Sequence, residues 1–84
     1  MGKQEMNNLE KYKKAFMEVF EVDETALGGD FSSDTVEKWD SVSQMTLVTV
    51  LEESFDIMID IDDIYELTSF DKGMEVLKKY GVEL

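Results

Sequence analysis

Ser41 is the residue best suited to covalent chemistry in this sequence. It follows Asp40, stands two residues after the only tryptophan, Trp39, and begins an apolar pattern with helical spacing. A serine at a helix start is commonly a cap, and with Gln44 three residues later it matches a capping box. If Asp40 is the cap instead, Ser41 becomes the first helical residue and its hydroxyl points outward. In both cases the hydroxyl lies beside unpaired backbone N–H groups and the positive end of a helix dipole, a setting that favours a phosphate ester.

The sequence contains no histidine and no cysteine. Ser41 therefore has no internal base, and neither a Ser-His-Asp arrangement nor a thiolate metal site can be built. Paired carboxylates could serve acid–base chemistry, but they need a cleft. A chain of 84 residues forms one small domain, 1–84, that buries only about 60–65% of its unfolded surface. We expect no enzyme, and any reaction at Ser41 must be catalysed by another protein.

The charge is strongly negative, with 20 acidic residues against 8 lysines and a formal net charge of −12. Such a chain is repelled by nucleic acid and by anionic membranes and is attracted to basic protein surfaces. Between Trp39 and Asp71 there is no basic residue, and the acids there are Asp40, Glu52, Glu53, Asp56, Asp60, Asp62, Asp63, Glu66 and Asp71. A solvated acidic surface kept for solubility is the simpler alternative, and charge alone does not decide between the two.

A calcium loop of the EF-hand type requires glycine at its sixth position and glutamate at its twelfth. Counted from Asp30, these positions hold Thr35 and Ser41, and counted from Asp60 the sixth holds Tyr65. No specific metal site is expected, although loose binding of divalent ions stays open.

The elements that must position Ser41 are helices. Apolar residues at helical spacing predict helices up to about residue 21, over 41–55, briefly over 62–67, and from about residue 69 to Gly81. The result is an all-α fold, a small four-helix bundle of three main helices plus a short third one. The connection over residues 21–38 is unusually long, and we expect apolar anchors to pin it. These anchors are Leu27, Phe31 and Val36.

The helix over 41–55 has two different faces when it is projected at about 100° per residue. The predicted core side holds Gln44, Leu47, Val48, Leu51 and Phe55. The opposite side holds Val42, Met45, Thr46, Thr49, Glu52 and Glu53. Two hypotheses explain the apolar residues on this second side: another segment of the chain covers them, or they form a docking face with an acidic rim. The two glutamates favour docking, because acids in the last helical turn oppose the helix dipole.

The sequence resembles an acyl carrier protein of the small stand-alone type. The resemblance lies in Asp40-Ser41-Val42 at the start of the second helix, in "LVTVLEESF" over 47–55, and in the helix and long loop that precede them. It implies that a phosphopantetheinyl transferase attaches 4′-phosphopantetheine from coenzyme A to Ser41, with Asp40 as its motif neighbour. It also implies that the thiol of this arm carries acyl groups as thioesters, and that the face from Val42 to Glu53 docks on basic patches of partner enzymes. The attached chain would fold back near Leu51, Ile64 and Leu67.

Four positions depart from the fatty-acid carriers of that family: Val42 replaces leucine, Ser43 and Thr46 replace acids, and Asp60 replaces a proline. The cargo therefore stays open among fatty, polyketide, aminoacyl and other acyl groups. An acidic interaction module, a degenerate carrier that never receives the arm, is the alternative function.

The N-terminal residues lack the apolar run of a signal peptide, and Met6 breaks the myristoylation pattern. We expect a monomeric, cytoplasmic protein that does not bind membranes.

Overall fold

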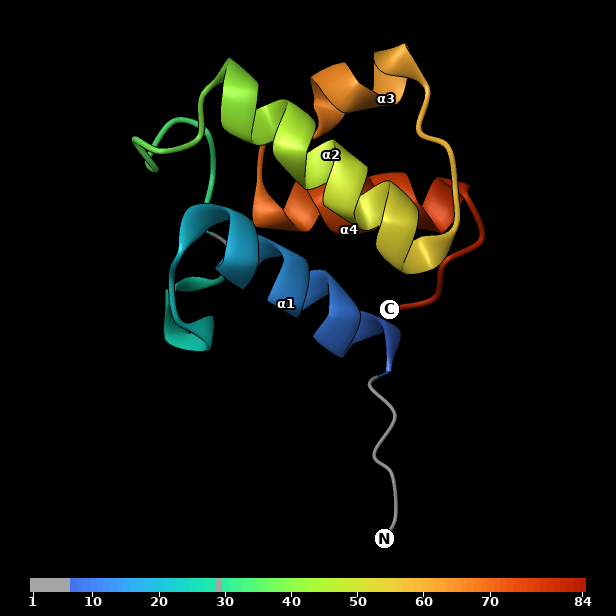
Figure 1. The fold of residues 1–84 in the computed structure, drawn as a ribbon, viewed down its shortest axis with the longest axis horizontal. Helices are drawn as coiled ribbons and strands as arrows, with labels where there is room; N and C mark the ends of the chain where they lie inside the picture. Colours follow the sequence, from blue (N-terminus) through green and yellow to red (C-terminus); the bar gives the residue numbers. More distant parts are fainter. Residues whose placement is uncertain (1–6, 29) are drawn as a thin grey trace, which may run out of the picture.

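Four α-helices and one short 3₁₀ helix form within residues 7–28 and 30–84, the part of the chain that the computed structural model describes (Figure 1). They are α1 (Asn8–Phe20), η1 (Glu24–Ala26), α2 (Ser41–Phe55), α3 (Ile61–Glu66) and α4 (Phe70–Lys79). Over these residues the only β pairing is an isolated bridge between Ser32 and Ser69. The predicted all-helical bundle of three main helices and a short third one is confirmed. Met6, which the sequence pattern assigned to the first helix, lies outside the described residues.

The helix α1 begins where its sequence offers a complete capping box. The Asn7 side chain accepts a hydrogen bond from the Glu10 N–H (2.8 Å), and the Glu10 carboxylate accepts one from the Asn7 N–H (3.1 Å). The residues that it buries, Tyr12, Ala15, Phe16 and Phe20, recur at spacings of one helical turn. The helix α1 packs along α2, and α3 packs against α4.

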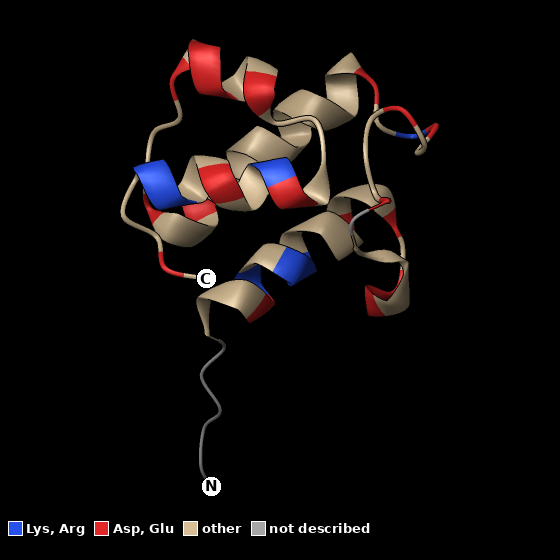
Figure 2. Ribbon diagram, turned by 180° about the vertical axis from the view of Figure 1, so that it is seen from behind, with Lys and Arg blue, Asp and Glu red and all other residues tan. Residues whose placement is uncertain are grey.

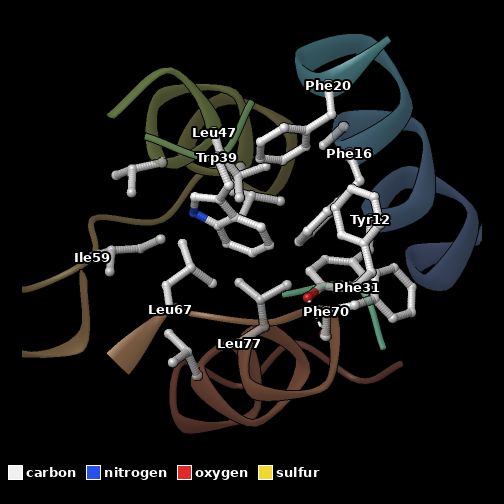
Figure 3. Packing of buried hydrophobic residues seen from close by; sticks show 14 of the residues in the cluster. Tyr12, Phe16, Phe20, Phe31, Trp39, Leu47, Ile59, Leu67, Phe70 and Leu77 are labelled. Carbon is white, nitrogen blue, oxygen red and sulfur yellow. Dashed lines mark hydrogen bonds between the residues drawn. The ribbon is translucent and has the colours of Figure 1, made fainter. Parts of the chain in front are cut away.

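The long connection over residues 21–40 is held by aromatic packing. Phe31 is buried as predicted, Leu27 and Val36 are half-buried, and Trp39 is an additional buried anchor. The Trp39 ring lies against the rings of α1, with centroids 5.7 Å from Phe16 and 4.9 Å from Phe20 (Figure 3). Trp39 thereby fixes the residues just before Ser41 onto the core.

Two backbone hydrogen bonds tie the same connection to the start of α4. The Ser33 N–H donates to the Thr68 carbonyl (2.8 Å), and the Phe70 N–H donates to the Phe31 carbonyl (2.8 Å). The long connection therefore has a defined path past the C-terminal end of α3.

Candidate functional site at the start of α2

Asp40, and not Ser41, caps α2. Its carboxylate accepts a hydrogen bond from the Ser43 backbone N–H (2.9 Å), and this bond holds the pKa of the Asp40 carboxyl below its usual value. The alternative capping box between Ser41 and Gln44 does not form, because the Gln44 side chain turns toward α3. Ser41 is thus the first helical residue, and it is exposed.

Ser41 lines an open cavity of about 460 Å³ at the surface. The cavity is bounded by the long connection, the first turn of α2 and the C-terminal part of α3, so that three separate segments of the chain meet at this serine. Its lining residues are Ser33, Trp39, Asp40, Ser41, Gln44, Met45, Ile64, Tyr65 and Thr68. Its volume falls within the range of pockets that hold small ligands.

Gln44 connects these three segments through one side chain. Its amide nitrogen donates to the backbone carbonyls of Ile64 (2.8 Å) and Leu67 (2.9 Å), and its amide oxygen accepts a hydrogen bond from the Trp39 indole N–H. Both amide hydrogens are therefore used. The helical projection placed Gln44 on the core side of α2, where it is half-buried, but it could not show these partners.

The predicted docking face is exposed along most of α2. Val42 and Met45 are 75% and 52% exposed, and Thr46, Thr49 and Glu53 are exposed as well. The first of the two hypotheses required another segment of the chain to cover Val42 and Met45. No described segment covers them. The two threonine hydroxyls donate back to carbonyls of the preceding turn (3.0 Å each), so this face stays regular and helical.

Glu52 differs from the other members of that face. It is half-buried, and its carboxylate accepts a hydrogen bond from the Ile59 backbone N–H (2.9 Å) in the connection after α2. This contact within the chain accounts for an acid in the last turn of α2, where the helix dipole disfavours it. Of the two glutamates that favoured docking, only Glu53 lacks such an explanation.

A second exposed apolar group follows α2 and was not found from the sequence. Met58, Ile61 and Tyr65 are 85%, 64% and 73% exposed. The spacing of Ile61 and Tyr65, four residues apart in a six-residue helix, was the available signal. Tyr65 and Met45 both line the cavity, so it lies between the apolar residues of α2 and those of α3.

The three residues expected near the attached chain do not share one open space. Leu51 and Leu67 are fully buried in the core, whereas Ile64 is half-buried and lines the cavity beside Ser41. Figure 3 shows Leu67 packed between Ile59 and Leu77.

The short helix α3 is fixed at its other end by the last residues of α4. The Tyr80 hydroxyl accepts a hydrogen bond from the Asp60 backbone N–H (2.8 Å) and donates one to Asp63 (2.6 Å), and Lys79 pairs with Asp63 (3.0 Å) and Glu66 (3.1 Å). The Tyr80 and Lys79 hydrogen bonds lower the pKa of the Asp63 carboxyl. A proline at position 60 would have no N–H for Tyr80, which gives the departure at Asp60 a structural reason.

Over the described ranges, no group of three or more potential metal-ligating side chains is gathered closely enough to hold an ion. None of the helices in those ranges has the length and apolar character that crossing a membrane requires.

Comparison of the chain with protein-family models, with curated proteins and with solved structures gives no significant match.

Proposed function

We propose that this protein is an acyl carrier protein, a monomeric cytoplasmic domain of the acyl-carrier type that carries 4′-phosphopantetheine on Ser41. The observation that supports this most directly is the place of Ser41, an exposed hydroxyl on an open cavity beside a docking face without a positive charge. The group, once attached, supplies a terminal thiol that holds an acyl group as a thioester. The residues present fit such a group, since Ser33 and Thr68 line the cavity with hydroxyl groups.

Attachment requires a separate transferase, because this chain holds no histidine that could activate Ser41. The Ser41 oxygen forms a bond to the phosphorus that bears pantetheine in coenzyme A. The bond between this phosphorus and the bridging pyrophosphate oxygen breaks, and adenosine 3′,5′-bisphosphate leaves. The proton of the Ser41 hydroxyl passes to a base of the transferase.

The surface of α2 supports docking on a basic partner. Figure 2 shows Lys residues on α1, on α4 and on one loop, whereas α2 and α3 show none. The exposed apolar centre at Val42 and Met45, with Glu53 at its edge, combines the two features that a docking surface uses. An acidic interaction module that never receives the arm is the alternative, and the same exposed apolar residues favour it.

The test is modification of the purified protein by a broad-specificity phosphopantetheinyl transferase with coenzyme A, followed by intact mass measurement. We expect a gain of one phosphopantetheinyl group that is absent in Ser41→Ala. An unchanged mass, under conditions that modify a control carrier, would contradict the carrier function and leave the interaction module.

The same reaction tests the docking face. Glu53→Lys and Met45→Glu should each slow modification by about fivefold or more, since one reverses a rim charge and the other places a charge in the apolar centre. Glu75→Lys is the matched control, because it makes the same charge change at an exposed position of α4. If all three variants are modified equally fast, the α2 face is only a solvated surface.

A further inference from the structure

The hydrogen bonds of Gln44 close the route from Ser41 to the interior between α2 and α3. A chain that entered there would have to pass Gln44, which joins α2 to the backbone carbonyls of Ile64 and Leu67 and to the Trp39 indole. Leu47 and Leu51 of α2 and Leu67 after α3 belong to the core cluster, and all three are fully buried.

Opening this bridge would leave strong hydrogen-bonding groups without partners. The Trp39 indole N–H would lose its acceptor and the Leu67 carbonyl would lose its donor, whereas the Ile64 carbonyl keeps the hydrogen bond from the Leu67 N–H (3.1 Å). An alkyl chain offers none of these groups a replacement, and unpaired polar groups in a buried setting are costly.

The opposite end of α3 is fixed as well. Tyr80 holds the Asp60 N–H and the Asp63 carboxylate, and Lys79 pairs with Asp63 and Glu66. A movement of α3 away from α2 therefore breaks the Gln44 contacts near its C-terminal end and, where α4 stays in place, the Tyr80 and Lys79 contacts as well.

The cavity on the outer side of the bridge has a mixed lining. Its polar side chains are those of Ser33, Asp40, Ser41, Gln44 and Thr68. Its apolar and aromatic side chains are those of Trp39, Met45, Ile64 and Tyr65. The hydroxyls of Ser33 and Thr68 can pair with an amide or hydroxyl of a short bound group, and these polar residues interrupt the continuous apolar surface that a long alkyl chain needs.

We infer that this carrier holds a short or polar acyl group in the outer cavity beside Tyr65 and does not take a long alkyl chain into the helical interior. This inference rests on the proposed carrier function and specifies the class of its cargo. The residue that determines it is Gln44, a positioning residue that acts through Trp39 and α3.

The experiment loads Ser41 from acetyl-coenzyme A and from octanoyl-coenzyme A with the same transferase and compares NMR spectra of the two forms. We expect the methyl signals of Leu51 and Leu67 and the Trp39 indole N–H signal to be the same in both. Signals of Ile64 and Tyr65 should shift in each form relative to the unmodified protein. Methyl shifts at Leu51 and Leu67 in the octanoyl form alone, with a displaced Trp39 signal, would overturn the inference while the carrier function stands.

The variant Gln44→Ala removes the bridge, and in it the octanoyl form should shift the Leu51 and Leu67 methyl signals. Ser54→Ala, an exposed truncation on the same helix and outside the docking face, is the matched control and should behave like the native chain. If Gln44→Ala does not fold, the comparison of the two loaded native forms decides alone. If the Leu51 and Leu67 methyl signals stay unshifted in the octanoyl forms of both Gln44→Ala and Ser54→Ala, the role of Gln44 is overturned. Failure to modify Ser41 at all would overturn both the inference and the proposed function.

Discussion

The carboxylate of Asp40, the residue before Ser41, has a structural role at the start of α2, and this role depends on its charge. Its carboxylate caps α2 through the Ser43 N–H, and this hydrogen bond favours the ionised form. The side chain that fixes the helix start, and with it the position of the Ser41 hydroxyl, therefore titrates in acid.

The cap predicts that the difference in stability between the native chain and Asp40→Asn depends on pH. Asp40→Ala loses the cap and should lower the midpoint of thermal unfolding at pH 7 by roughly 4–8 °C, whereas Asp40→Asn keeps it. Since the folded-state pKa of Asp40 is depressed, the advantage of its ionised form is present above the unfolded-state pKa of about 3.9. It is lost as the pH falls through the folded-state pKa.

Thermal melts of the native chain and of Asp40→Asn at pH 7 and near pH 3 measure this difference. We expect the native chain to lose stability relative to Asp40→Asn in acid. A difference between the two that does not change with pH would show that the charge of Asp40 contributes nothing to the cap.

Gln44 shows the limit of prediction at the scale of a residue. The sequence allowed either Ser41 or Asp40 to be the cap, because both types serve at this position. It offered no way to see that the Gln44 amide reaches carbonyls 20 and 23 residues further along the chain. Such a partner depends on how α3 packs, and α3 is fixed in turn by Tyr80 and Lys79.

At the scale of elements, the packing of the Tyr12 side chain of α1 onto α4 depends on one glycine. A Cβ on Gly73 would collide with the Tyr12 hydroxyl and would lie 2.8 Å from Leu67 Cδ1. The Tyr12 hydroxyl is buried and donates to the Phe70 carbonyl (2.5 Å), and burial together with nearby Asp71 raises its pKa. The tyrosine therefore has no room to retreat without losing its partner.

This contact predicts that Gly73→Ala destabilises the fold by about 1–3 kcal/mol, because overpacking exceeds the gain of roughly 1 kcal/mol in helix propensity. Tyr12→Phe removes the colliding oxygen, so the double variant should lose less stability than the sum of the two single variants. Urea unfolding of all four chains measures the coupling. Gly28→Ala is the control, since an added Cβ there meets nothing within 4 Å. If the stability losses of Gly73→Ala and Tyr12→Phe are additive, or if Gly73→Ala loses no stability, α4 can shift away from Tyr12 without cost.

The helices were predictable because their signals are local. The bounds 41–55 agree with α2, and the expected short helix over 62–67 is displaced by one residue from Ile61–Glu66. Apolar spacing and caps lie within the segments that they define. Tertiary contacts decided the rest: Trp39 packs onto Phe16 and Phe20, and Glu52 binds the Ile59 N–H, so one predicted docking residue has a role inside the fold.

At the scale of the whole molecule, the positive charges are confined to a few segments. Within the described residues 7–28 and 30–84, lysines lie on α1, on α4 and at Lys38, while residues 39–71 contain nine acids and no base. Several lysines are already engaged within the chain, as in the pairs Lys13–Glu24 (3.0 Å) and Lys79–Asp63 (3.0 Å). The surface that includes α2 and α3 therefore has a negative potential that a basic partner would relieve.

Self-repulsion should make the fold sensitive to ionic strength. Raising NaCl from about 10 mM to about 1 M shortens the Debye length from roughly 30 Å to roughly 3 Å. Two opposing effects follow: the exposed ion pairs weaken, and the repulsion among the carboxylates of a chain with a net charge of −12 weakens too. The repulsion should dominate, because exposed pairs contribute little to stability and the acids outnumber the lysines.

We therefore expect salt to raise the midpoint of thermal unfolding by several degrees, measured by circular dichroism. The double variant Glu53→Gln, Asp62→Asn removes two exposed charges from α2 and α3 and should show a smaller increase. A midpoint that does not change with salt would show that the acids are spaced too widely to repel, and the absence of positive charge on α2 and α3 would then have no cost to the fold. A smaller increase in the double variant would instead show that these acids destabilise the free protein, a cost that the proposed docking on a basic partner would offset.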